Sequence, residues 1–367
     1  MSEPKPIPPP KYPGLILTPC LEDNPAPHTL KLLEKLCKNY IGSDEVFSVT
    51  YSPLLCPEGK NYLYTLKPYW WEVEPGHWEH RDGRRNPYCE LPQGQNQLQR
   101  ASMAIHTLAL GSKYLPYLAD QCSKQAENLL RYFFINHDTR MLPEILYAQC
   151  NPSSSLLKGD QAFVIAIRYF VLISSTLTFL NIPQELLDDL RIWFRNHLNW
   201  ITTSEQGAMA RAYGNNITIW YHALVATHLS LVNPPEAAVY SLTALQEIHA
   251  RHTTPESFFS RELSRTRPRH YTLFTLEPVF LLSSQTGKIP PDDVYQYLRD
   301  LVEYARHVTG SPIEIEVDDN PRYFAKLEWF ETMLKRWSGQ SKKTEEPDGT
   351  QWDGGWNQFA RVLWGFI

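Results

Sequence analysis

The sequence has no apolar run long enough to cross a membrane. The longest candidate, residues 163–180, is interrupted by Arg168 and by the polar residues 174–176, whereas a membrane-spanning helix needs about 20 mostly apolar residues. The first residues, MSEPKPIPPPKYPG, also lack the apolar stretch of a secretory signal. We therefore expect a soluble protein without a membrane partner, cytoplasmic as written, or secreted if a signal has been removed.

Paired cysteines and a strong charge of one sign are missing as well. The chain has six cysteines: Cys20, Cys37, Cys56, Cys89, Cys122 and Cys150. They are scattered without a CxxC pair, which indicates reduced thiols instead of a zinc site or a disulfide framework. The net charge of −5 makes nucleic acid a poor partner. His77 and His80 form an HxxH pair without a third ligand at a recognisable spacing, so we predict no metal and no cofactor.

Strand-like patterns are scarce, with residues 62–66 and 312–317 as the clearest examples. From Gln97 onward, apolar residues recur with helical periodicity, and the breaks coincide with glycine and proline. The predicted helices are residues 29–40, 97–110, 114–136, 158–181, 184–201, 216–231, 236–250, 272–285, 292–308, 320–337 and 355–365. We expect an all-α protein, built as a bundle, a solenoid or an α/α toroid; the absence of a fixed repeat period disfavours the solenoid.

The N-terminal part of the chain is irregular. Nine of the first 27 residues are proline, which predicts an extended arm. We divide the chain into this arm with a short helix (residues 1–60) and a single helical domain (residues 61–367), in which the polar run 339–350 is expected to be a mobile surface loop. Residues 48–92 are dense in Pro, Gly, Trp and Tyr, and long irregular segments of this kind are usually functional.

The excess of aromatic residues, 11 Trp and 20 Tyr, coincides with charged residues in the segments 68–90, 212–222 and 261–272. Arginine clusters in the first and third segments indicate a local anionic ligand in a chain of net negative charge. Surface salt bridges with nearby acids are the alternative. Trp70 and Trp71 are adjacent and cannot easily both point into a core, so at least one is a candidate platform for stacking on a sugar ring.

Asn215 and Asn216 follow Gly214 at the predicted start of a helix. An N-cap accounts for one of the two asparagines. Two side-chain amides at a helix N-terminus, where backbone N–H groups also point outward, would equally suit a bound carboxylate.

Four segments together resemble the alginate lyase superfamily (polysaccharide lyase families 5 and 38). YWWEVEPGHWEHRDGRRNP at 69–87 is similar to its aromatic, Arg-Asp-Gly and Asn-Pro signature, and LPEILYAQ at 142–149 to its Asn-Pro-x-x-x-Tyr-Ala-Gln segment. FRNHLNWITTSEQG at 194–207, followed by NNITIWYHAL, resembles its Trp-Leu-x-x-Ser-x-x-Gly and Asn-Asn-His-Gly-Thr-Trp-Tyr motifs. ELSRTRPRHY at 262–271 resembles its Glu-Leu-x-Arg-Thr element, with a tyrosine six residues after the arginine.

The resemblance covers about two-thirds of the chain and implies an incomplete α/α toroid that cleaves an anionic, uronate-containing polysaccharide by β-elimination. It implies that Asn216 and Arg265 neutralise the carboxylate, which makes the C5 proton acidic. Tyr271, with its pKa depressed by the adjacent arginine, would then be base, acid or both. The predicted catalytic residues are Tyr271, Arg265 and Asn216, with His222 as a candidate substitute for the family's histidine. The implied substrate-binding residues are Asn215, Tyr69, Trp70, Trp71, Arg81, Trp220, Tyr221, Gln149, Arg267 and His270.

The chain departs from the family pattern at the third position of the Asn-Asn-His motif, where it has Ile217. His222 and His270 are candidates to replace the histidine, with structural roles as the alternative. Without a replacement, one tyrosine must make both proton transfers, which requires the proton and the leaving group to lie on the same face of the ring, as in β-mannuronate and β-glucuronate. Three hypotheses follow: an active uronate lyase, a lyase fold that transforms a small acidic cytosolic metabolite, and a non-catalytic carbohydrate-binding protein.

Overall fold

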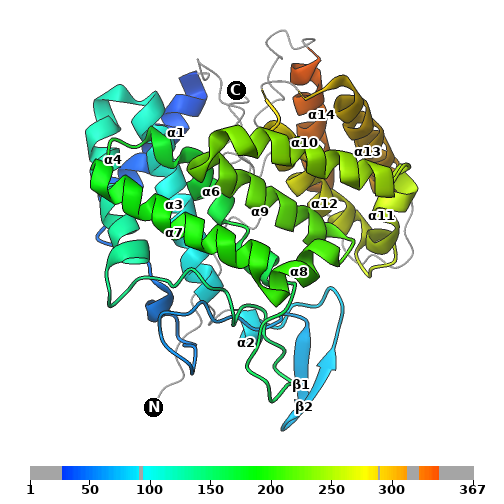
Figure 1. Ribbon diagram of the computed structural model, residues 1–367, viewed down its shortest axis with the longest axis horizontal. Helices are drawn as coiled ribbons and strands as arrows, with labels where there is room; N and C mark the ends of the chain where they lie inside the picture. Colours follow the sequence, from blue (N-terminus) through cyan, green and yellow to red (C-terminus); the bar gives the residue numbers. More distant parts are fainter. Residues whose placement is uncertain (1–26, 91–93, 288–289, 312–321, 339–367) are drawn as a thin grey trace.

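The computed structural model describes residues 27–90, 94–287, 290–311 and 322–338 (Figure 1). The predicted N-terminal arm, the strand at 312–317, the polar run 339–350 and the helix at 355–365 lie outside the described residues.

Helices account for most of the described chain. The long and medium helices are α1 (Pro27–Ile41), α3 (Gly94–Tyr114), α4 (Ala119–Leu130), α7 (Gln184–Thr203), α8 (Glu205–Ala212), α9 (Asn216–Val232), α10 (Pro234–Arg251), α11 (Pro255–Leu263), α12 (Pro268–Ser284), α13 (Asp292–Gly310) and α14 (Arg322–Trp337). The short ones are α2 (Pro87–Glu90), α5 (Phe163–Ile167), α6 (Phe170–Thr176), the 3-10 turns η1 (Val49–Tyr51), η2 (Pro116–Leu118) and η4 (Leu177–Phe179), and the π-helical turn η3 (Arg131–Ile135).

The helices form two layers, which makes the protein an incomplete α/α toroid. Helix α9 is buried almost all round and packs against α6, α7, α10 and α12. Helices α3 and α12 are likewise buried on most sides, whereas α4, α7 and α13 bury only one face. A helix that is buried all round belongs inside and an amphipathic helix covers it, so burial assigns α3, α9 and α12 to the inner layer (Figure 1).

Helix α1 is part of the same body. It packs against α3 and α4, and its Leu33 and Cys37 join the core that also holds Phe47 and Val49. Nowhere in the described chain does a helix have the length and apolar character needed to cross a membrane.

Two predictions of local structure were wrong. The single helix expected at 158–181 is broken into α5, α6 and η4, because the chain turns at Arg168, whose Nη1 donates to the carbonyl of Ile165. Residues 62–66 form no strand, since the only pairing there is an isolated bridge between Leu66 and Cys150.

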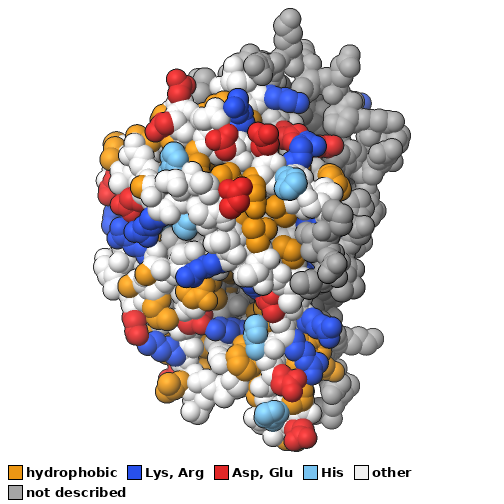
Figure 2. Space-filling model, turned by 90° about the vertical axis from the view of Figure 1, so that its right-hand side faces the viewer, with side chains coloured by type: hydrophobic (Ala, Val, Ile, Leu, Met, Phe, Trp, Pro, Cys, Tyr) orange, Lys and Arg blue, Asp and Glu red, His pale blue; other side chains and the backbone are white. Residues whose placement is uncertain are grey.

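The sequence analysis also missed a hairpin and two helices, α8 and α11. Strand β1 (Trp70–Glu74) pairs antiparallel with β2 (His77–His80), with Gly76 at φ 76° in the turn. A positive φ favours glycine at such a turn. The hairpin projects from the helical layers in Figure 1, and Figure 2 shows charged side chains of both signs and histidines gathered at that end of the molecule.

Candidate active site

A cavity of about 650 Å³ lies between the hairpin segment, the start of α9 and the start of α12. It takes its lining from segments far apart in the sequence: 67–85, Gln95, 149–168, 213–217, 261–277 and Lys326. The predicted residues that line it are Tyr69, Trp70, Gln149, Asn215, Asn216, Arg265, His270 and Tyr271. The fold therefore brings the core of the predicted site together.

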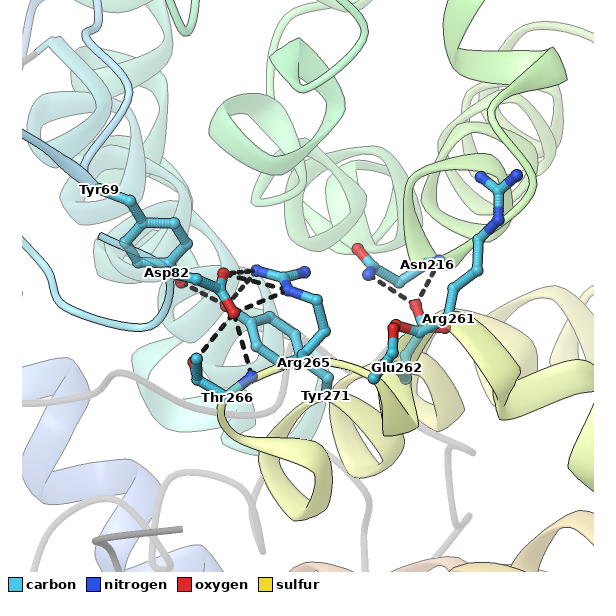
Figure 3. Close-up of polar contacts among 9 residues, drawn as sticks. Tyr69, Asp82, Asn216, Arg261, Glu262, Arg265, Thr266 and Tyr271 are labelled. Carbon is cyan, nitrogen blue, oxygen red and sulfur yellow. Dashed lines mark hydrogen bonds and ion pairs between the residues drawn. The ribbon is translucent and has the colours of Figure 1, made fainter. Parts of the chain in front are cut away.

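One side of the cavity holds what we call the tyrosine cluster, made of Tyr69, Asp82, Arg265 and Tyr271 (Figure 3). The Nη2 of Arg265 donates to the Tyr271 hydroxyl at 2.7 Å, and this hydroxyl shares a hydrogen bond of 2.8 Å with that of Tyr69. The guanidinium of Arg265 also lies 3.8 Å from the centre of the Tyr271 ring. The oxygen of Tyr271 is thus held between a cation and a second phenol.

The Arg265 side chain is already paired within the protein. Its Nε donates to both carboxylate oxygens of Asp82 at 3.0 and 3.1 Å, and its Nη2 donates to one of them as well. Thr266 binds the same carboxylate through its backbone N–H and its hydroxyl. Burial opposes ionisation of Asp82, but the hydrogen bonds from Arg265 and Thr266 outweigh it and hold the Asp82 pKa at about 2.

The loop that carries Asp82 approaches the turn between α11 and α12 very closely. Gly83 has φ 70°, and a Cβ at this position would lie 2.6 Å from the hydroxyl oxygen of Thr266. The loop is also tied to the hairpin, because the Asn86 side chain donates to the carbonyl of Trp70 at 2.7 Å. A side chain at residue 83 would therefore push Asp82 away from Arg265.

The expectation that the pKa of Tyr271 is depressed was wrong, although Arg265 itself does lower it. Burial raises the pKa of Tyr271 well above its ordinary value, and the neighbouring Tyr69 raises it further. Arg265 lowers this pKa only in part, because the negative charge of Asp82 works against it. The resting enzyme therefore holds Tyr271 as a neutral phenol at neutral pH.

A second group, which we call the asparagine cluster, consists of Asn216 and Glu262. The backbone N–H and the side-chain Nδ2 of Asn216 both donate to Oε1 of Glu262, at 3.0 and 2.9 Å (Figure 3). Glu262 is 1% exposed, and its Oε2 has no hydrogen-bond partner among the described residues. Burial raises the pKa of Glu262, and the hydrogen bonds from Asn216 offset this only in part.

The N-terminus of α9 offers a substrate fewer donors than the sequence suggested. Asn215 is the N-cap, and its side-chain oxygen accepts from the N–H of Ile217 at 3.0 Å. The N–H of Thr218 donates to the Asn215 carbonyl, and that of Asn216 is bound by Glu262. Glu262 therefore occupies the position at the helix N-terminus that an external carboxylate could have taken.

The adjacent tryptophans diverge as the sequence predicted. They lie next to each other on β1, so their side chains point to opposite faces. Trp70 lines the cavity, whereas Trp71 lies outside it, donates from Nε1 to the carbonyl of Arg84 at 3.0 Å and carries Arg81 over its ring. Trp70 is thus the platform available to a sugar ring.

Gln149 is held in an unusual backbone conformation at the cavity wall. With φ 59°, it is the only described non-glycine residue with a positive φ. Its backbone N–H and side-chain Nε2 both donate to the hydroxyl of Thr65, at 2.6 and 3.2 Å. Strained residues of this kind concentrate at functional sites, which agrees with the location of Gln149.

The structure places the remaining predicted residues away from the cavity. Arg81 pairs with Glu79, and Arg267 donates to the hydroxyl of Tyr323. Trp220 and Tyr221 are buried in the core, and His222 lies in a small neighbouring cavity with its Nδ1 at 2.8 Å from the hydroxyl of Tyr240. Burial lowers the pKa of His222 to about 4.

Of the two candidate histidines, only His270 faces the same space as Ile217. It stacks on Phe274, with ring centres 6.0 Å apart, and contacts the ring of Tyr271 edge-on at 5.0 Å. Burial, together with nearby cations of which Lys326 is the strongest, lowers the pKa of His270 well below its ordinary value. His270 is therefore a neutral imidazole and adds no positive charge to the site.

The cavity is rich in cations. Its lining has six Lys and Arg side chains against the two carboxylates of Asp82 and Glu277. The cations are Lys67, Arg85, Arg168, Arg261, Arg265 and Lys326. Sequence reasoning did not single out Lys67, Arg168 or Lys326, nor the polar Gln95 and Gln161, because each lies in a segment with no motif of its own. Within the described part of the chain, no group of three or more His, Cys, Asp or Glu side chains could hold a metal ion.

Comparison with known proteins gives two results. The model of the alginate lyase family matches residues 56–301, which is about two-thirds of the chain. An alginate lyase crystal structure from Bacteroides ovatus has the same fold with a TM-score of 0.73, 19% sequence identity and coverage of 91% of this chain and 92% of that one. A search of curated proteins finds no match.

The matched residues include the whole cavity lining except Lys326. The fold and the family together define a polysaccharide lyase, an enzyme that acts on an anionic polysaccharide. The chain belongs to the alginate lyase family.

Proposed function

We propose that the enzyme cleaves a β-linked polyuronate, polymannuronate or glucuronan, by syn β-elimination, with Tyr271 as both base and acid. The hydroxyl cluster of Tyr69 and Tyr271 beside Arg265 carries this proposal. It places one phenol oxygen between the Arg265 guanidinium and a second hydroxyl, inside a cavity in which cations outnumber carboxylates. Ile217 lines the same cavity where the family pattern has a histidine, so the tyrosine is the group suited to both proton transfers.

The reaction requires Tyr271 as the phenolate. Its oxygen takes the proton from C5, the electron pair of the C5–H bond forms the C4=C5 double bond, and the C4–O4 bond breaks. The Tyr271 hydroxyl then gives the same proton to O4 of the leaving sugar, which restores the phenolate. Hydrogen bonds from Tyr69 and from Nη2 of Arg265 stabilise that phenolate against the effect of burial.

The substrate carboxylate must be neutralised before C5 becomes acidic. Asn216 faces the cavity with the amide that Glu262 orients, and Arg265 lies beside Tyr271 with its charge shared with Asp82. We assign these two residues to the carboxylate of the sugar that loses its proton. The other cavity cations provide the positive field that attracts a polyanion, and Trp70 offers a ring face to the sugar.

Replacing Tyr271 by Phe tests this assignment. We expect Tyr271→Phe to lower kcat at least about 1,000-fold, because one group makes both proton transfers, with little change in the affinity for the polymer. Formation of the 4,5-unsaturated uronate, followed by its near-ultraviolet absorbance, is the measurement. Tyr117→Phe, at an exposed residue of η2 outside the cavity, is the matched control and should leave kcat unchanged.

The substrate is identified by the same absorbance assay on a panel of polymannuronate, polyguluronate, glucuronan and glycosaminoglycans. Because a single tyrosine can reach the proton and the leaving oxygen only on one face, we expect activity on polymannuronate or glucuronan and none on polyguluronate. Equal activity on polyguluronate would contradict the single-tyrosine mechanism.

A further inference from the structure

A second part of the cavity wall comes from the chain between Gln161 and Arg168. Gln161, Ala162, Ile165 and Arg168 all line the cavity, and α5 (Phe163–Ile167) lies between the two ends of this set. Because all four residues line the cavity, this stretch of chain presents one face to it. This face presents a cation and an amide to the cavity, and the tyrosine and asparagine clusters use neither.

Arg168 has no carboxylate within ion-pairing distance among the described residues. In contrast, the cavity residues Lys67 and Lys326 pair with Asp160 and Glu277. Arg168 donates from Nη1 to the Ile165 carbonyl and from Nη2 to the Tyr169 hydroxyl at 2.9 Å, both neutral acceptors. Its Nε is buried and without a partner in the described structure. Since a guanidinium has five N–H donors, both its charge and part of its hydrogen-bonding capacity remain for a ligand.

The guanidinium of Arg168 is fixed in place by two aromatic rings. It lies 4.5 Å from the ring centre of Tyr169 and 5.8 Å from that of Phe274. Stacking and the two hydrogen bonds restrict its rotation, so that a planar anion meets a pre-organised fork. Arg261 also lacks a carboxylate partner in the described structure, but its side chain is exposed and donates to the carbonyl of Tyr213.

Gln161 adds an unused acceptor to the same face. Its Oε1 is buried and has no hydrogen-bond partner among the described residues. A buried amide oxygen without a partner costs free energy, which a ligand hydroxyl recovers when the Gln161 side chain turns its oxygen into the cavity that this residue lines. A cation and a free acceptor on the same cavity wall match a uronate, which carries a carboxylate and hydroxyl groups on one ring.

This face lies in the same cavity as Tyr271, and the rings of His270 and Phe274 lie between Tyr271 and Arg168. Tyr271 contacts His270, His270 stacks on Phe274, and Phe274 contacts the Arg168 guanidinium. Arg168 is therefore not in the hydrogen-bonded cluster that acts on the sugar at Tyr271. A polymer that crosses the cavity would place a neighbouring sugar there.

We propose that Arg168 and Gln161 form a second uronate subsite, in which Arg168 binds the carboxylate and Gln161 accepts from a hydroxyl of a sugar next to the one that is cleaved. The inference rests on the proposed function, because it takes the substrate to be a polyuronate. It makes the enzyme selective for contiguous uronates over polymers in which uronates alternate with neutral sugars.

The test compares trimannuronate with the same trisaccharide in which the two flanking carboxyls are reduced to alcohols and the reacting uronate is kept. Arg168→Gln should lower kcat/KM about 10- to 100-fold on trimannuronate, as expected for a charge-assisted bidentate contact. The kcat/KM of wild type should be lower by the same factor on the reduced trisaccharide than on trimannuronate. On the reduced trisaccharide, the kcat/KM of Arg168→Gln should differ from that of wild type by less than twofold. Arg131→Gln, at a surface arginine paired with Glu127, is the matched control and should change neither.

Equal losses on both trisaccharides, or no loss on either, would overturn the subsite. The wild-type comparison needs no substitution, so it tests the subsite even if Arg168→Gln does not fold. Equal kcat/KM values of wild type on the two trisaccharides would also overturn the subsite. If wild type and Arg131→Gln cleave no polyuronate, the proposed function fails separately. Calorimetric binding of uncleaved trimannuronate then decides about Arg168, whose replacement by Gln should weaken binding of trimannuronate and not of its reduced form.

Discussion

The two clusters at the active site differ in the state of their carboxylates. Asp82 is held by Arg265 and Thr266, and its pKa is about 2. Glu262 receives hydrogen bonds from Asn216 alone, has one oxygen without a partner among the described residues, and has a raised pKa because it is buried. Asp82 is therefore firmly ionised, whereas burial disfavours the ionised form of Glu262.

The two carboxylates position different side chains. Asp82 fixes the Arg265 fork against Tyr271 and also offsets its charge, so in the proposed mechanism Arg265 positions the phenol as much as it attracts the substrate. Glu262 orients the Asn216 amide. Because an ionised carboxylate can only accept hydrogen bonds, the Nδ2 of that amide, and not its oxygen, faces Glu262. Each motif residue therefore depends on an acid that the protein supplies for it.

The largest effect is expected from breaking the fork in the tyrosine cluster. Arg265→Lys keeps the charge but cannot bind Asp82 and Tyr271 together, because an ammonium lacks the planar geometry. We expect kcat/KM to fall about 100- to 1,000-fold in the absorbance assay, the range for loss of a transition-state electrostatic contact. Arg306→Lys, at a surface arginine paired with Glu331, is the control; retention of more than a tenth of the activity by Arg265→Lys would show that charge alone suffices.

A smaller effect is expected from neutralising Asp82 without changing its shape. Asp82 raises the pKa of Tyr271, so Asp82→Asn should lower that pKa. In wild type, kcat/KM should still rise with pH at pH 9, because the phenolate is the active form of a tyrosine with a raised pKa. In the variant this rise should begin at lower pH. A pH profile of kcat/KM measures it, and an unchanged profile would show that Asp82 does not act on Tyr271 through its charge.

The smallest effect is on stability, where the two carboxylates should act in opposite directions. The folded-state pKa of Asp82 lies below its ordinary 3.8, so its contribution is present above about pH 4 and is lost as pH falls towards 2. The pKa of Glu262 is raised, so its contribution is present below its ordinary 4.5 and is lost as pH rises.

Chemical denaturation between pH 4.5 and 8 checks this contrast. Asp82→Asn should lower the free energy of unfolding by about 1 kcal/mol at every pH in this range, a value discounted for partial exposure of the pair. Glu262→Gln should become more stable relative to wild type as pH rises. A Glu262→Gln difference that is constant with pH would mean that the pKa of Glu262 is not raised in the folded state.

The sequence predicted the inner helices and much of the site, because both leave local signals. Periodicity marked α9 and α12, and the motifs marked Asn216, Arg265 and Tyr271. The pairing of Asp82 with Arg265 spans 183 residues and could not be read from either segment. Arg168 carries no motif, and its proposed role depends on the lack of a carboxylate partner among the described residues, which only the three-dimensional arrangement shows.

Gly83 also bears on how the active site forms during folding. Its lack of a side chain lets the loop beside the hairpin rest on Thr266, 184 residues from the Asp82 that Thr266 binds. Contacts of such long sequence separation form after local helices, because closing a long loop costs entropy that few local contacts repay. Under the proposed mechanism, Tyr271 therefore has its hydrogen-bond partners in place only once the hairpin segment has docked on the turn between α11 and α12, and enzyme activity would report completed tertiary folding.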